Sequence, residues 1–268
     1  MTREEAEAAL KVIGRRPEAE FVLWDAALLC AQHDDPARDT AGARAVAAEA
    51  AERLARRLER QPCDEALADA LCGDLDFAGD LLNYDDLANA DMISVCQRRK
   101  GLPVALGVVF ITAARACGLD LQGADFPAHF LLRLEHDEGP LAVDPFAGGR
   151  VVMPSELVSR ALHAGLTPGV ADDLERLMNP IPDRQVLIRL QNNVFVRAWN
   201  AGDYRRAERV AIRRALLDPV DHKPWIDVAA AREAQGALNG AMDAFSRAAE
   251  LGGAPAHAAR NRLRLKLN

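Results

Sequence analysis

The first hundred residues carry apolar side chains at helical intervals. Thr2 and Glu5 form a capping-box pattern ahead of an amphipathic stretch, and residues 19–30 keep their apolar side chains on one face. Residues 41–60, AGARAVAAEAAERLARRLER, are rich in Ala, Leu, Arg and Glu, which are strong helix formers. We therefore predict that the N-terminal part of the chain is mainly helical.

An almost wholly apolar helix is predicted for residues 103–118, PVALGVVFITAARACG. Pro103 suits its first turn, where a missing N–H leaves no hydrogen bond unmade, and Gly118 suits a left-handed C-terminal stop. A helix that is apolar on every side is usually buried. The pattern predicts the central helix of a domain core.

Three short runs after this helix predict strands: LDLQGADF, HFLLRLEH and PLAVDP. The HDEGP segment between the second and third indicates a hairpin loop. A buried helix on a small antiparallel sheet predicts an α+β fold. Helical patterning returns over residues 153–180 and ends at NPIPD, so we expect one domain over residues 1–180, with its core at about 76–150, and a second over 181–268.

The second domain contains a short internal repeat. Gly202 and Ala207 recur as Gly236 and Ala241, each displaced by 34 positions. Tetratricopeptide repeats have this period, and their small residues permit the close approach of paired helices. The pattern predicts about two such α-helical repeats, which commonly dock a protein or peptide partner.

Charge and composition narrow the classes of partner. The chain has 268 residues, 50% of them hydrophobic, and a formal charge of −7, but residues 181–268 hold 15 basic against 9 acidic side chains. These basic residues alternate with acidic ones and lack interleaved aromatics, which favours a solvated helical face over nucleic-acid binding. No apolar run approaches the ~20 residues of a membrane span, and the N-terminus is charged from its third residue, so we expect a cytoplasmic protein without membrane partners.

A histidine and an aspartate face each other across the predicted hairpin. His129 stands near the start of one strand and Asp144 at the end of the next. A carboxylate beside an imidazole can orient it for proton transfer. The alternatives are a histidine that fixes hairpin register, an Asp144 that caps the turn before Gly148 and Gly149, and a metal ligand pair, which lacks the further ligands that zinc needs.

Three motifs resemble the transglutaminase-like domain of the bacterial SirB-like family: RRKGLPVALG, DFPAHFLLR and DPFAGG. The resemblance begins at about residue 76 and extends to the C-terminus, because tetratricopeptide repeats follow the domain in that family. It implies that His129 and Asp144 match the family's His and Asp. It also implies a papain-like design, with a cysteine at the N-terminus of the central helix, where the helix dipole lowers the pKa of a thiol.

The expected nucleophile is missing. Residues 101–107 read GLPVALG and contain no Cys, Ser or Thr. SirB-like proteins resemble this chain in having Pro103 at that place, often with a serine two residues later, where this chain has Ala105. Cys96 lies seven residues before Pro103 and could fold back toward the same pocket, whereas Cys117 stands roughly 20 Å away along the helix.

Two readings of function follow. The first is a non-catalytic interaction or regulatory protein, built on a transglutaminase-like domain without its cysteine, with Tyr84, Asn89, Pro103 and Ala105 lining a groove. The second is an amide or ester hydrolase, or an acyl transferase, that uses the histidine–aspartate pair with water or Cys96. Tyr84 and Asn89 also fit ordinary turn chemistry, and the five cysteines, odd in number and without a C-x-x-C pair, fit reduced thiols. We expect no cofactor, no metal and a protein or peptide partner.

Overall fold

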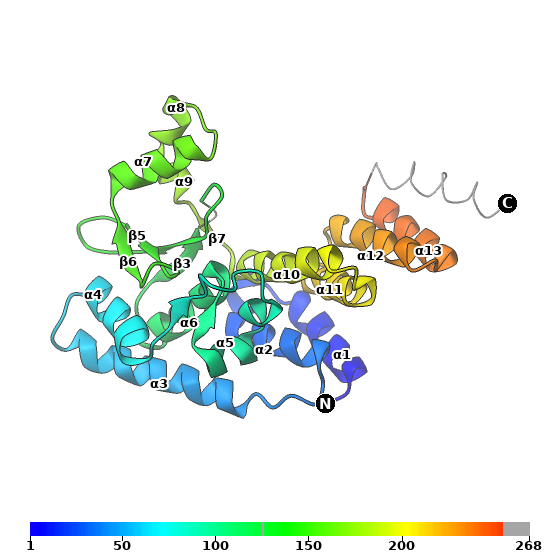
Figure 1. Cartoon of the computed structure of the whole chain (residues 1–268), viewed down its shortest axis with the longest axis horizontal. Coiled ribbons are helices and arrows are strands. Elements are labelled where there is room, and N and C mark those ends of the chain that lie inside the picture. Colours follow the sequence, from blue (N-terminus) through cyan, green and yellow to red (C-terminus); the bar gives the residue numbers. More distant parts are fainter. Residues whose placement is uncertain (125, 254–268) are drawn as a thin grey trace. The chain divides into compact units, whose positions relative to one another are not determined.

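The computed structural model describes residues 1–124 and 126–253 (Figure 1). Contacts divide the chain into two compact units. One contains Met1–Phe21, Leu29–Arg38 and the residues from Leu187 onward, and the other contains Val22–Leu28 and Asp39–Val186. In the first unit the N-terminal residues therefore group with the C-terminal helices, and the division of the chain predicted at NPIPD stays a prediction.

The unit that contains Asp39–Val186 is built around α6 (Pro103–Ala116), which coincides with the predicted central helix. Pro103 occupies its first turn, and ten of its residues are buried. Helix α3 (Ala41–Leu58) packs against α6, and α5 (Met92–Arg98) packs against α3. The helix predicted at residues 41–60 is thereby observed. The remaining helices of this region are α4 (Cys63–Ala68), the π-helix η2 (Asp69–Asp74) and the 3-10 helix η3 (Leu87–Ala90).

The predicted sheet is antiparallel and larger than the sequence suggested. Its five strands run in the order β6-β5-β4-β3-β7. The three predicted strands form its centre, while the flanking segments add an outer strand on each side. The strands are β3 (Leu121–Ala124), β4 (Leu131–Leu134), β5 (Leu141–Asp144), β6 (Arg150–Val152) and β7 (Pro180–Ile181), and a separate parallel pair joins β1 (Ala78–Gly79) to β2 (Lys100–Gly101).

Opposite faces of the sheet bury different elements because side chains alternate along each strand. Leu131 on β4 joins Leu157 and Ala161 in an apolar cluster. The adjacent Leu132 is fully buried and belongs to the other face, on the side of the strands that α6 contacts. In Figure 1 the first face is covered by α7 (Pro154–His163), α8 (Pro168–Ala171) and α9 (Leu174–Leu177).

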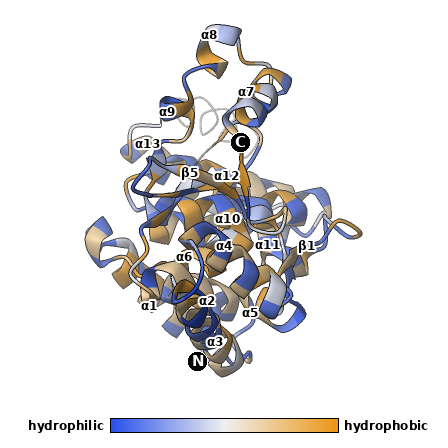
Figure 2. Cartoon of the chain, turned by 90° about the vertical axis from the view of Figure 1, so that its left-hand side faces the viewer, coloured by the Kyte–Doolittle hydropathy of each residue, from blue (hydrophilic) through white to orange (hydrophobic). Residues whose placement is uncertain are grey.

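The other unit is helical. Its N-terminal helix begins with the predicted capping box, in which Thr2 Oγ1 accepts from the Glu5 N–H at 3.1 Å and the Glu5 carboxylate accepts from the Thr2 N–H at 2.8 Å. Hydrophobic and hydrophilic residues are interspersed along the helical ribbons, as amphipathic packing requires (Figure 2). The helices are α1 (Arg3–Gly14), the 3-10 helix η1 (Glu18–Glu20), the last turns of α2 (Leu23–Asp34), most of α10 (Asp183–Asn200), α11 (Tyr204–Leu217), α12 (Lys223–Ala234) and α13 (Leu238–Glu250).

Two close contacts explain why the N-terminal residues group with α11. A Cβ added at Gly14 would lie 1.8 Å from the Leu216 carbonyl oxygen, so the two backbones touch there. The side chain of Arg213 is 2% exposed and donates a hydrogen bond to the Cys30 carbonyl at 2.5 Å. Neither contact has a local sequence signal.

The residues of the predicted repeat occupy matching places. Gly202 and Gly236 both adopt positive φ, at 73° and 78°, in the turns that precede α11 and α13. Ala207 and Ala241 follow in those helices and are fully buried. Successive helices α11, α12 and α13 pack on one another.

Candidate functional site

The N-terminus of α6 carries no nucleophilic side chain. Its first residues are Pro103, Val104 and Ala105, and the methyl group of Ala105 is fully buried. The backbone N–H of Leu102 donates to the Asn89 carbonyl at 2.9 Å, which joins the start of the helix to η3. The place at which the resemblance implies a cysteine is therefore filled by small apolar residues.

His129 stands in a tight turn before β4. It is exposed, and its backbone N–H donates to the Phe126 carbonyl at 3.1 Å. The preceding residue, Ala128, has a φ of 60°, an uncommon conformation for a residue with a side chain. The turn brings its imidazole to the protein surface.

Phe130 anchors that turn on α6. A Cβ added at Gly107 would lie 2.4 Å from the Phe130 ring, and one added at Gly123 would lie 2.6 Å from Val186 and 3.1 Å from the same ring, so a side chain at either position would crowd Phe130. The ring is 4% exposed. A bulky apolar side chain next to His129 thus covers the first turns of the helix.

The carboxylate of Asp144 serves the turn that follows β5. Its Oδ1 accepts from the N–H groups of Phe146 and Ala147, both at 3.1 Å. Its Oδ2 accepts from Arg160 Nη1 on α7 at 2.9 Å. The predicted turn-capping role is therefore observed, and Arg160 is the cation that compensates the buried carboxylate.

Arg160 belongs to a chain of ion pairs along α7. Its guanidinium also contacts Glu156 at 2.7 Å, and Glu156 receives two hydrogen bonds from Arg150, at 2.6 Å and 2.8 Å. These bonds, first from Arg150 and then from Arg160, lower the pKa of Glu156 to about 2. The four charged groups hold the DPFAGG turn and β6 against α7.

The glycines of the same turn permit close packing. Gly148 and Gly149 have φ values of 76° and 72°, as the sequence predicted for this turn. A Cβ added at Gly149 would lie 3.0 Å from the Phe110 ring on α6. The DPFAGG turn, which follows β5, thus packs directly against the central helix α6.

Tyr84 and Asn89 lie in the segment between β1 and α5, with Asn89 in η3. Tyr84 is 45% exposed and meets the Phe146 ring edge-on, at 5.8 Å between centroids. Asn89 is fully buried; its amide donates to the Asn83 carbonyl at 2.7 Å and accepts from Arg98 at 3.1 Å. Tyr84 reaches the surface, whereas Asn89 and Ala105 are buried.

A buried aspartate completes the support of this loop. Asp80 is 3% exposed and pairs with Arg98 at 2.8 Å. The hydrogen bond from the Asn83 N–H, followed by those from Asn89 and Arg98, lowers the pKa of Asp80. Polar contacts therefore hold this segment in place, whereas Leu81 and Leu82 are exposed and contribute little apolar packing.

The Cys96 thiol is unsuited to nucleophilic attack in this conformation. It is buried on α5, and burial raises its pKa to about 12. A thiol with that pKa is protonated at neutral pH, whereas the thiolate is the reactive form. Among the described residues, no three His, Cys, Asp or Glu side chains form a group that could hold a metal ion.

A second candidate surface lies on the helical unit. Phe195, Val196, Trp199 and Asn200 on α10 line a hollow of about 280 Å³ with Asp227 and Ala230 on α12. The Phe195 and Trp199 rings stack at 5.9 Å between centroids, and Val196 is 50% exposed. Aromatic and aliphatic side chains therefore meet at the surface of this unit.

Comparison with known proteins identifies the domain. A family model described as the transglutaminase-like superfamily matches residues 41–192, more than half of the chain. The chain belongs to the transglutaminase-like superfamily. The superfamily expected from RRKGLPVALG, DFPAHFLLR and DPFAGG is confirmed, and the transglutaminase-like domain contains both His129 and Asp144.

Similar proteins occur in bacteria and animals. A UPF0162 protein of Xylella fastidiosa is 36% identical over 181 residues, covering 66% of this chain and 63% of the relative. The UPF0162 protein of Pseudomonas aeruginosa is 29% identical over 237 residues, covering 81% and 80%. Human F-box only protein 21 is 36% identical over 69 residues, covering 26% of this chain and 11% of the relative.

The matches cover only part of the length of some relatives. This chain spans 63% and 52% of the length of two Xylella UPF0162 relatives. No solved structure matches it significantly. None of the helices in the described residues is both long and apolar enough to span a membrane.

Sequence reasoning missed the partners of Asp144. Arg160 and Glu156 were predicted only as part of a helical stretch, although their four-residue spacing is a helical ion-pair signal. Nothing local links Arg160 to a carboxylate sixteen residues earlier. The Phe195 and Trp199 pair was also missed, and its signal was two large aromatic side chains four residues apart in one helix.

Proposed function

We propose that this chain is a non-catalytic protein-interaction or regulatory protein of the SirB-like type. The observation that carries the proposal is the start of α6, where Pro103 stands at the place that the resemblance assigns to the reactive cysteine and the nearby Ala105 is fully buried. Loss of the nucleophile removes acyl-enzyme chemistry, because no neighbouring hydrogen bond can replace an attacking group.

The surroundings of Asp144 support the same proposal. Its oxygens accept from two backbone N–H groups and from Arg160. A catalytic carboxylate orients an imidazole, whereas this one caps a turn and neutralises an arginine. The raised pKa of Cys96 argues against a substitute thiol.

Partner docking is proposed for the hollow on α10 and α12, with helices α10–α13 acting as two tetratricopeptide-like repeats. Its stacked Phe195 and Trp199 offer apolar contact area, and the adjacent Asp227 is paired with Arg214 at 2.7 Å. A hollow of about 280 Å³ suits one or two side chains of a peptide rather than a whole small molecule. We propose an extended or helical peptide that inserts an apolar side chain.

The test replaces Val196 by Glu in the full chain. Affinity capture from the native cells should lose its specific partners with Val196→Glu, because a carboxylate in the hollow opposes apolar insertion. Val220→Glu is the matched control, since Val220 is 78% exposed and does not line the hollow. If the wild type, Val196→Glu and Val220→Glu all retained the same partners, the docking proposal would be wrong.

The hydrolase alternative rests on one feature, the exposed His129 beside the strained Ala128. Hydrolysis of an activated acyl ester separates the two proposals. We expect the wild type, His129→Ala and Asp144→Asn to share one slow rate. A wild-type rate that falls by about 100-fold in His129→Ala, as loss of a general base produces, would establish the enzyme instead.

A further inference from the structure

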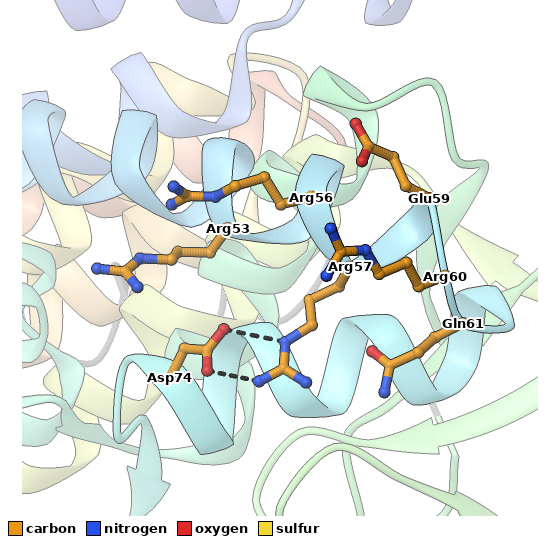
Figure 3. Close-up of a pocket in the computed structure, with 7 residues that line it drawn as sticks. All are labelled: Arg53, Arg56, Arg57, Glu59, Arg60, Gln61 and Asp74. Carbon is orange, nitrogen blue, oxygen red and sulfur yellow. Dashed lines mark hydrogen bonds and ion pairs between the residues drawn. The ribbon is translucent and has the colours of Figure 1, made fainter.

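Four arginines surround one pocket at the end of α3. Arg53, Arg56 and Arg57 share a face of the helix, and Arg60 follows just beyond its end, at spacings of three, four and seven residues. The pocket has a volume of about 430 Å³ and is completed by Glu59, Gln61 and Asp74. Figure 3 shows Arg53 and Arg56 extending in one direction from the helix, while Arg57 turns toward Asp74.

Arg57 is fixed in place by carboxylates. It donates to both oxygens of Asp74, at 3.1 Å and 2.6 Å, and to Asp69 at 3.1 Å. Gln61 donates to the same Asp69 oxygen at 2.8 Å. The bidentate contact lowers the pKa of Asp74, so the pair stays charged near neutral pH. Arg57 therefore forms one rigid wall of the pocket and has little positive charge to spare.

The other three arginines are weakly compensated. Arg53 meets Glu49 at 3.3 Å and Arg56 meets Glu52 at 3.8 Å, and all four side chains are well exposed. Surface pairs of this kind contribute little and are screened by salt. Arg60 is exposed, and its side chain has no hydrogen bond or ion pair with any described residue. Three guanidinium groups thus remain able to bind an anion.

The charge balance of the pocket decides the sign of the ligand. Its lining holds four arginines against Glu59 and Asp74, whereas Glu49, Glu52 and Asp69, which pair with Arg53, Arg56 and Arg57, lie outside the lining. The C-terminal carbonyls of α3 add a negative partial charge of about one half, which is smaller than the remaining excess. Arg57 is needed to pair with Asp69 and Asp74, whereas the exposed pairs of Arg53 and Arg56 are weak, and Arg60 has no carboxylate partner among the described residues.

Size and hydrogen-bonding capacity narrow the ligand further. A volume of about 430 Å³ lies in the range of small-molecule sites and exceeds what a lone phosphate ion fills. Guanidinium groups match the oxygens of phosphate in a two-point geometry. Gln61 lines the pocket, and its Oε1 accepts no hydrogen bond from any described residue, so the lining contains an unpaired polar acceptor. We propose that this pocket binds a small phosphate-bearing molecule of about mononucleotide size.

The test measures binding of pyrophosphate and adenosine 5′-monophosphate to the full chain by calorimetry at low salt. Both should bind saturably, and Arg56→Gln with Arg60→Gln should weaken each by at least about tenfold, because charge-assisted hydrogen bonds are lost. Arg15→Gln with Arg205→Gln is the control, since it removes the same charge from exposed positions outside the pocket. The melting temperature of each variant verifies folding.

Three results would overturn the proposal. The first is the absence of saturable binding of either compound up to about 10 mM, the weakest range that a specific site would show. The second is equal weakening of binding by the control variant. The third is binding only to vesicles that contain anionic lipid. The last would show that the arginines meet a membrane surface instead of a small molecule. The pocket shares no residue with the hollow on α10 and α12, so Val196→Glu should leave phosphate binding unchanged.

Discussion

Replacing Gly107 by Ala should destabilise the domain, because the new methyl group would collide with Phe130. The added Cβ would lie 2.4 Å from the ring, whereas carbon atoms normally pack at about 3.5–4.0 Å. The ring cannot retreat freely, since it also contacts Gly123 and is 4% exposed. Overpacking of this size costs about 1–3 kcal/mol, and the higher helix propensity of Ala returns up to about 1 kcal/mol.

Thermal unfolding measures this change. A net loss of about 1–2 kcal/mol should lower the melting temperature by roughly 2–8 °C in a protein of this size. Gly42→Ala is the control, because nothing lies within 4 Å of a Cβ at Gly42 in α3, and its stability should stay equal or rise. Adding Phe130→Leu to Gly107→Ala should cost less than the sum of the two single changes. Equal behaviour of the Gly107 and Gly42 variants would refute the packing argument.

Three further predictions concern ionisable groups. Cys96, whose pKa is raised to about 12 by burial, should resist iodoacetamide in the native protein at pH 7.5 and react after unfolding; rapid native labelling followed by mass spectrometry would contradict this. Glu156 has a folded pKa of about 2 against 4.5 in the unfolded chain, so it stabilises the fold above pH 4.5 and this contribution is lost as the pH falls toward 2. Arg150→Gln should therefore reduce the fall of the urea unfolding midpoint between pH 4.5 and 2. Burial lowers the pKa of His33 below 6.5, so the folded state resists protonation of this side chain and the free energy of unfolding should fall as the pH drops below 6.5. His33→Gln should therefore reduce the difference between the urea midpoints measured at about pH 7.5 and 5.5. An unchanged difference would exclude His33 as its source.

Local patterns were sufficient for the elements of the core. The apolar run after Pro103 produced a buried helix, and the runs around Leu121, Leu132 and Val143 produced neighbouring strands. Each of these follows from periodicity and turn chemistry, which act over a few residues. The short strand Pro180–Ile181 was expected only as part of a boundary, because two residues carry no periodic signal.

Pairings between distant segments required the tertiary structure. The sequence placed Asp144 at the end of a strand, and the fold decided that its partners are a turn and Arg160. Similarly, the helical patterning of α1 gave no sign that it packs against α11, a contact made possible by the missing side chain of Gly14.

The sequence by itself determined the transglutaminase-like core and the absence of a nucleophile over residues 101–107, because both depend on residue identity and local order along the chain. Only the tertiary structure decided that Asp144 is neutralised by Arg160, that Cys96 is buried, and that four arginines line one pocket with Asp74. Those properties depend on burial and on distances between side chains from different elements, which the chain acquires when it folds.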